Sequence, residues 1–97
     1  MNLSVRQGRP MRRKDVWLRQ SNKKENAVFN PSTSEVYLLN DTALAIWDLC
    51  DGETKPEEMM TAICDLTGLP PEVVAEDLER ILLEFDTAEL LEWVEEA

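Results

Sequence analysis

The feature that most constrains the fold is the run SEVYLLNDTALAIWDLCDG at residues 34–52, in which a strand-like pattern passes into a helix-like pattern without a linker. Successive side chains of a strand point to opposite faces, so Val36 and Leu38 share one face while Tyr37 and Leu39 share the other. Neither face is clearly polar. We therefore expect this strand to be covered on both sides.

The second half of the run predicts a helix that begins directly after the strand. The side chain of Asn40 or Asp41 can cap its N-terminus, and Gly52 is expected to end it. Between them, apolar residues recur at the i, i+3, i+4, i+7 spacing of an amphipathic helix, at Ala43, Ile46, Trp47 and Cys50.

Two further β-prone runs precede this strand, VWLRQ at residues 16–20 and AVFN at residues 27–30. The polar residues between them, and the segment 31–33 before the next run, are typical of turns. Together with residues 35–39, these runs predict a three-stranded antiparallel meander.

Two more helices are expected after the first. The residues from Thr54 to Glu57 match a capping box with proline in the first turn, and an apolar stripe continues from there to Gly68. Pro70 and Pro71 open a third helix, whose apolar face consists of Val74, Leu78, Ile81, Leu82 and Phe85. The last segment, AELLEWVEE, fits either a helix or a strand with a turn. The expected fold class is α+β, a winged helix-turn-helix with a three-stranded antiparallel sheet followed by three short helices.

Composition makes an enzyme a poor interpretation. A chain of 97 residues that is 43% hydrophobic can build one modest core, and this chain has no histidine. Without histidine it lacks the usual general base at neutral pH and the commonest zinc ligand. We expect no catalytic residue, no metal site and no cofactor. A catalytic subunit built on acidic residues is the weakest of the three functions considered.

The two cysteines, Cys50 and Cys64, are too far apart for a C-x-x-C pair and fall on apolar helix faces. We expect buried free thiols rather than a disulfide, which favours a reducing compartment. No apolar run approaches the roughly 20 residues that a membrane-spanning helix needs. The expected location is cytoplasmic, with no membrane partner.

Charge divides the chain into two parts. Residues 1–24 hold eight of the ten Lys and Arg residues and one of the twenty Asp and Glu residues. The segment 1–14 is basic and poor in apolar residues, so we expect a disordered tail there and a folded domain over residues 15–97. A nucleic-acid-binding arm is the alternative interpretation of the tail.

A winged helix-turn-helix raises the hypothesis of a DNA-binding transcriptional regulator. The third helix would then be the recognition helix, yet its one basic residue is Arg80 among Glu72, Glu76, Asp77, Glu79 and Glu84. Carboxylates are repelled by the phosphates that line a DNA groove. We expect no specific nucleic-acid partner, and the regulator remains the alternative function.

The run VYLLNDTALAIWDLCDGETKPEEMMTAI, followed by PPEVVAEDLERILLEF, resembles the PqqD-like family of small winged-helix domains, also called RiPP recognition elements. The resemblance covers residues 15–92. Its specificity depends mostly on Leu39, Asn40, Thr42, Ala43, Ile46, Leu49, Asp51 and Gly52.

This resemblance implies a non-catalytic adaptor. Such a domain binds the leader segment of a ribosomally made precursor peptide and presents it to a modifying enzyme, either a radical-SAM enzyme or a leader peptidase and cyclase. Pathways of the pyrroloquinoline quinone type, the lasso type and other peptide modifications are all consistent with it.

An unpaired strand edge is a template for β-strand addition, so we expect the leader to add antiparallel to residues 35–39. Its apolar side chains would enter a pocket near Val36, Leu78 and Ile81. Acidic residues beside this groove favour a leader with Lys or Arg next to its apolar anchors. The expected contact residues are Glu35, Val36, Tyr37 and Leu38 of the strand and Val74, Asp77, Leu78 and Ile81 of the third helix.

Overall fold

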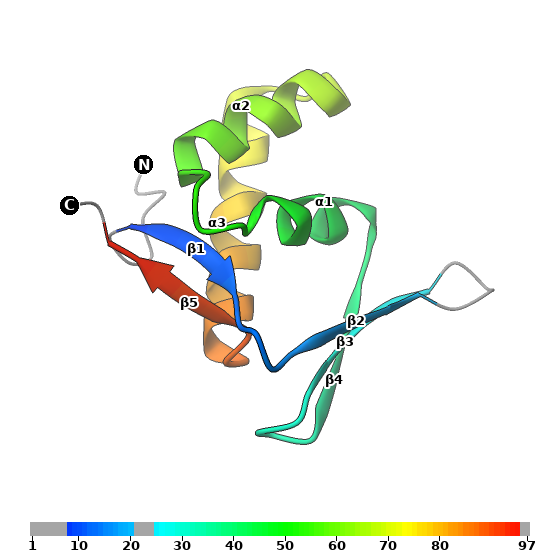
Figure 1. The fold of residues 1–97 in the computed structure, drawn as a ribbon. Helices are drawn as coiled ribbons and strands as arrows, with labels where there is room; N and C mark the ends of the chain where they lie inside the picture. Colours follow the sequence, from blue (N-terminus) through cyan, green and yellow to red (C-terminus); the bar gives the residue numbers. More distant parts are fainter. Residues whose placement is uncertain (1–7, 21–24, 96–97) are drawn as a thin grey trace.

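The structure is a computed structural model that describes residues 8–20 and 25–95. It contains two antiparallel sheets and three helices, arranged as Figure 1 shows. In chain order the elements are β1 (Arg9–Arg12), β2 (Trp17–Gln20), β3 (Asn26–Asn30), β4 (Glu35–Leu39), α1 (Asp41–Leu49), α2 (Pro56–Thr67), α3 (Pro71–Thr87) and β5 (Leu91–Val94). The predicted fold class, a winged helix-turn-helix of the α+β type, is confirmed.

The predicted meander is the larger sheet, in which β2, β3 and β4 are neighbours in that order. The register places Trp17 opposite Phe29 and Phe29 opposite Val36, so these three side chains form one row across the sheet. Val28 lies on the other face and is fully buried against the helices. In Figure 1 much of this sheet lies below and to the right of the three helices.

The smaller sheet is a two-stranded ribbon of β1 and β5, in which Pro10 pairs with Trp93. The prediction of disorder over residues 1–14 is therefore wrong for residues 9–12, while residues 1–7 lie outside the described part. The segment is basic and poor in apolar residues, so its composition predicts disorder. The prediction fails because β1 pairs with a strand about eighty positions away, and composition cannot reveal that pairing. The ambiguous C-terminal segment resolves as a turn followed by β5.

The ribbon is fastened to the end of α1 by Arg12. Its guanidinium donates hydrogen bonds to the carbonyls of Trp47 and Asp48, at 2.8 and 3.0 Å, and its backbone N–H donates to the carbonyl of Cys50. These carbonyls belong to the last turn of α1, where a helix leaves acceptors without partners and carries partial negative charge. Arg12 therefore adds a charged donor to the C-terminal cap of α1, in which the N–H of Cys50 also donates to the Trp47 carbonyl.

The helix boundaries agree with the predictions in part. Asn40 caps α1, because its Oδ1 accepts a hydrogen bond from the N–H of Ala43 at 2.8 Å. The capping box of α2 lies one residue later than predicted: Lys55 is the N-cap, and its N–H donates to Glu58. Lysine has no acceptor in its side chain, so only the Glu58 half of the box forms, while the Thr54 hydroxyl donates to Asp51.

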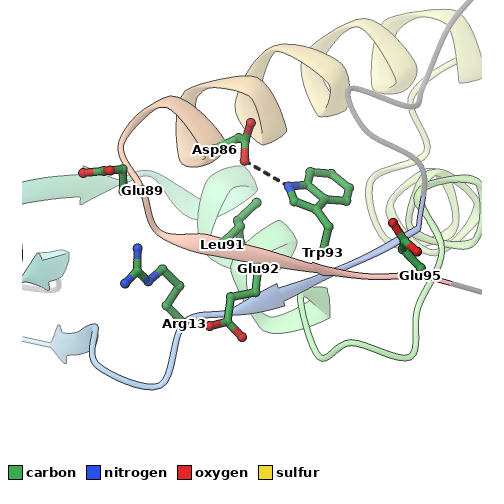
Figure 2. A pocket seen from close by; sticks show the side chains of 7 residues that line it. All are labelled: Arg13, Asp86, Glu89, Leu91, Glu92, Trp93 and Glu95. Atoms are coloured by element: carbon green, nitrogen blue, oxygen red, sulfur yellow. Dashed lines mark hydrogen bonds between the residues drawn. The ribbon is translucent and has the colours of Figure 1, made fainter.

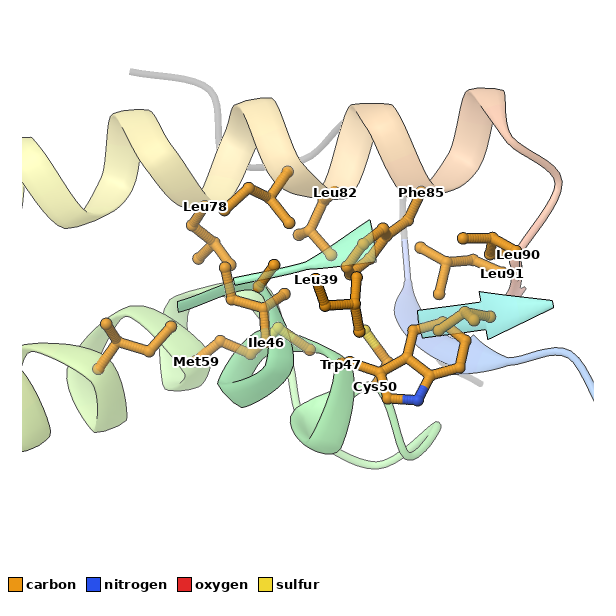
Figure 3. Close-up of a cluster of buried hydrophobic side chains, with 14 of the residues drawn as sticks. Leu39, Ile46, Trp47, Cys50, Met59, Leu78, Leu82, Phe85, Leu90 and Leu91 are labelled. Atoms are coloured by element: carbon orange, nitrogen blue, oxygen red, sulfur yellow. The ribbon is translucent and has the colours of Figure 1, made fainter. Parts of the chain in front are cut away.

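The core lies between β3, β4 and the three helices, as Figure 3 shows. Phe85 is its centre: it is fully buried and makes edge-to-face ring contacts with both Tyr37 and Trp47. The predicted apolar face of the third helix is confirmed, since Val74, Leu78, Ile81, Leu82 and Phe85 are all buried.

Both cysteines are free thiols, as predicted. Cys50 is buried, and burial raises the pKa of its thiol to about 12. Cys64 is half-buried. In the described ranges no helix is long and apolar enough to cross a membrane.

Candidate functional site

The open edge of β4 is the centre of the candidate site. In the order β2-β3-β4, β4 pairs with β3 on one side and, among the residues that the structure describes, with no strand on the other. Such an edge presents backbone N–H and C=O groups that another extended chain can pair with. β2 is the opposite edge of the same sheet, and all of its side chains are exposed.

A cleft of about 530 Å³ separates this edge from the C-terminal half of α3. Three carboxylates and three hydroxyl groups belong to its lining residues, together with apolar carbon surface. The lining residues are Thr33, Glu35, Tyr37, Glu84, Thr87, Ala88 and Glu89.

Tyr37 and Glu84 form a bridge between the two walls of this cleft. The Tyr37 hydroxyl donates a 2.5 Å hydrogen bond to Glu84 Oε2, and the Tyr37 ring packs edge-on against Phe85 beneath it. Burial, together with the hydrogen bond and negative charge of Glu84, raises the pKa of Tyr37 to about 12. The phenol therefore stays a neutral donor at physiological pH.

The bridge continues along α3 through Arg80. Its guanidinium lies 3.3 Å from Glu84 Oε1 and 3.6 Å from Asp77 Oδ1. All three side chains are substantially exposed, so these ion pairs orient Glu84 more than they stabilise the fold. The one basic residue of α3 is thus engaged by its own helix.

The structure divides the eight predicted contact residues into three groups. Glu35 and Tyr37 line the cleft, and Asp77 lies further along α3 in its ion pair with Arg80. Val36 and Leu38 point to the opposite face of the sheet. The third group, Val74, Leu78 and Ile81, is buried in the core.

The predicted pocket near Val36, Leu78 and Ile81 is therefore wrong. Alternation along β4 turns Val36 away from the helices when Tyr37 turns toward them. Leu78 and Ile81 belong to the buried face of α3, so neither side chain is available at an open surface. The pattern located the apolar face of the helix correctly, but that face packs in the core.

The sequence reasoning missed the contribution of the last turn of α3 to the cleft. This turn is held beside the sheet by Asn30, which is almost fully buried. Its Nδ2 donates to the carbonyls of Ala88 and Glu89, both at 3.1 Å, and its Oδ1 accepts from the N–H of Ser32. A polar residue at the end of a predicted strand was the available signal, but its partners lie 58 and 59 positions away.

A second hollow lies beside β5 and the C-terminal end of α3, and Figure 2 shows its lining. Trp93 forms one wall, where its indole N–H donates to Asp86 Oδ1 at 3.0 Å. Carboxylates outnumber the single cation, Arg13, which lies 3.3 Å from Asp15. Across the described residues, no three side chains of the metal-ligating types lie close enough together to hold a metal ion.

Comparison with known proteins places this arrangement among related domains. The family model for coenzyme PQQ synthesis protein D (PqqD) matches residues 25–91. A solved structure of TbiB1 in complex with the TbiA(beta) leader peptide has 26% sequence identity and a TM-score of 0.74, and the match covers 84% of this chain and 94% of that one. No curated protein sequence matches the chain.

A second solved structure shows the fold alone, because its sequence identity is 20%. It is the solution NMR structure of the PqqD truncation of Methylobacterium extorquens PqqCD, described as a functional and stand-alone RiPP recognition element. The TM-score is 0.73, and the match covers 95% of this chain and 99% of that one.

Proposed function

This chain belongs to the PqqD family, and we propose that it is a non-catalytic adaptor that binds the leader segment of a ribosomally made precursor peptide. The leader adds as a strand to the open edge of β4, and the adaptor presents it to a modifying enzyme. A radical-SAM enzyme, as in pyrroloquinoline quinone-type pathways, and a leader peptidase with a cyclase, as in lasso-type pathways, are the two classes of partner to examine. No cofactor has a role in this proposal.

The observation that carries the proposal is the position of the open β4 edge beside the cleft. Main-chain hydrogen bonds along an edge supply affinity with little dependence on sequence, while side-chain sites on either face of the added strand supply selectivity. A strand added to β4 would place alternate side chains in the cleft against Tyr37 and Glu84. A strand added to β2 would find no such wall, because every side chain of β2 is exposed.

The charge of the cleft suggests the chemistry of the leader. Glu35, Glu84 and Glu89 line it, and none of its described lining residues is basic, although Arg80 outside the lining is paired with Glu84. A Lys or Arg side chain of the leader that enters the cleft therefore meets complementary charge, and salt should weaken its binding.

The alternative of a DNA-binding regulator has weaker support. On α3, Arg80 is paired with Asp77 and Glu84, and the Arg12 guanidinium is directed at helix carbonyls rather than at solvent. We expect no sequence-specific binding of duplex DNA at physiological salt. A fluorescence anisotropy titration that found sub-micromolar, sequence-dependent binding would favour the regulator instead.

The test uses isotope-labelled protein and synthetic leader segments of any short precursor-like peptide that a search of the neighbouring genes identifies. A cognate leader should shift the amide resonances of residues 35–39 and give inter-strand contacts to β4. Resonance shifts confined to α2, with residues 35–39 unaffected, would show that the peptide docks elsewhere and that strand addition to β4 is wrong.

A further inference from the structure

The face of the three-stranded sheet that points away from the helices is apolar and open. Trp17, Val36 and Leu38 are 55%, 61% and 70% exposed, although all three are large hydrophobic residues. Trp17 also packs against Phe29, with ring centroids 5.8 Å apart. These apolar side chains are contiguous rather than scattered singly, which is a feature of interaction surfaces.

Two rows of side chains build this outer face. Trp17, Phe29 and Val36 form the first row across β2, β3 and β4, while Arg19, Ala27 and Leu38 form the second. Ala27 is too short to fill the space between the rows. The result is a hollow of about 270 Å³, lined by Trp17, Arg19, Ala27, Phe29 and Val36.

The size of the outer face limits what can cover it. Three strands about 4.8 Å apart, with four residues of about 3.3 Å each, give a face of roughly 200 Å². A stable interface between folded proteins buries about 800 Å² on each partner. This face alone is therefore too small for a stable dimer or a folded partner, and its dimensions suit a short extended peptide.

The outer face is continuous with the β4 edge. A strand that adds to β4 has its backbone one strand spacing away, and its alternate side chains point to the same face as Val36 and Leu38. Side chains directly opposite each other on neighbouring strands have Cβ atoms about 5 Å apart. A large side chain opposite Val36 would extend the row of Trp17 and Phe29 by one member.

We propose that the leader is recognised on both faces of its added strand, with large apolar side chains, aromatic or aliphatic, packed on Val36 and Leu38 of the outer face. This inference rests on the proposed function. The two faces select different residues, because the cleft is lined by three carboxylates and the outer hollow by none. The expected peptide therefore alternates, with basic or polar side chains toward α3 and bulky apolar side chains toward the outer face.

The experiment selects short random peptides, displayed on phage, for binding to the full chain. Enriched peptides should carry bulky apolar residues at every second position and should shift the amide resonances of residues 35–39. The double variant Val36→Thr with Leu38→Thr places a β-branched, strand-favouring side chain at both positions, and it should weaken binding of the enriched peptides about tenfold or more. Leu66→Ser, which changes an equally exposed leucine on α2, is the matched control and should leave affinity unchanged.

Three results would overturn the inference. If the peptides bind at β4 and the double variant binds them with equal affinity, the proposed function stands but this inference is wrong. The outer face then makes no contact that contributes to peptide affinity, and a protein partner becomes its expected occupant. If the protein sediments as a dimer and the double variant as a monomer, a second copy occupies the face. If no peptide is enriched, or the enriched peptides bind away from β4, strand addition fails and this inference fails with it.

Discussion

The two sheets of this protein differ in how much of their backbone edges and side-chain faces remains open to a partner. The ribbon of β1 and β5 is fastened on several sides: Arg12 binds the end of α1, the N–H of Gly52 donates to the carbonyl of Pro10, and Leu90 and Leu91 are buried. The three-stranded sheet packs β3 and β4 against the helices on one face, and it leaves the other face, β2 and the β4 edge open.

This difference separates stability from binding within a small domain. Side chains of the ribbon are engaged within the fold, so changes there should alter folding. Side chains on the outer face and open edge of the larger sheet have few partners within the fold, so changes there should alter binding and leave folding intact. In this winged helix-turn-helix, the β1–β5 ribbon therefore contributes mainly to stability, and the three-stranded sheet is open to a binding partner.

A matched pair of leucines gives the largest expected contrast. Leu90→Ala, just before β5, removes a side chain that is 1% exposed and should lower the free energy of unfolding by about 3 kcal/mol. Leu38→Ala, on the open face, should change it by less than about 0.5 kcal/mol. Urea denaturation measures both. Similar losses for the two variants would show that the outer face contributes to the core.

A matched pair of arginines should give a smaller contrast. Arg12→Ala leaves the carbonyls of Trp47 and Asp48 without their charged donor and should cost about 2 kcal/mol. Arg19→Ala, on exposed β2, should cost less than about 0.5 kcal/mol. Thermal unfolding of both variants in the same buffer makes the comparison. An Arg12→Ala protein as stable as the parent would mean that water replaces this cap without loss.

The free energy of unfolding should fall at alkaline pH because the thiol of Cys50 is buried. Unfolded Cys50 ionises near its ordinary pKa of 9.0, whereas the folded thiol keeps its proton to about 12. The stabilisation is therefore complete below pH 9 and is lost as pH rises toward 12, with a slope of at most about 1.4 kcal/mol per pH unit.

Urea denaturation between pH 8 and pH 10 measures this slope, and Cys50→Ala is the control. The variant should lack the thiol contribution while keeping every other titration. An identical slope in the two proteins would rule out a buried neutral thiol at this position.

The smallest effect is expected at the bridge over the cleft. Tyr37→Phe removes the hydrogen bond to Glu84 but keeps the ring on Phe85, so it should lower the free energy of unfolding by about 1 kcal/mol or less. Tyr37→Ala also removes the ring and should cost more. Equal losses for Phe and Ala, measured by urea denaturation, would assign the stability to the hydroxyl rather than to the packing.

The sequence predicted those parts of the fold that depend on local patterns. Alternation marked the meander, and the 3.6-residue period marked the buried face of α3, because each signal lies within one element. β1 was missed because a short basic segment with a proline acquires its strand conformation only by pairing with β5. The candidate edge was predicted correctly as part of the same meander.

The opposite wall of the cleft was not predicted, for a related reason. Glu84 and Thr87 lie on exposed positions of α3, and nothing local indicates which exposed positions face β4. Their placement depends on the distance and angle between helix and sheet, which arise from packing around Phe85. Periodicity identifies which face of a helix is buried and leaves its neighbours on the adjoining face undetermined.

The buried amide of Asn30 fixes the end of the cleft that lies beside Glu35. Its two donors tie the carbonyls of Ala88 and Glu89 to the end of β3 that pairs with Glu35, so the walls cannot part there without stranding a buried polar group. The other end of β4 is held as well, because Leu39 is buried in the core and the next residue, Asn40, caps α1. An incoming strand therefore meets an edge that is fixed at both ends, and it can bind without the sheet first having to become ordered.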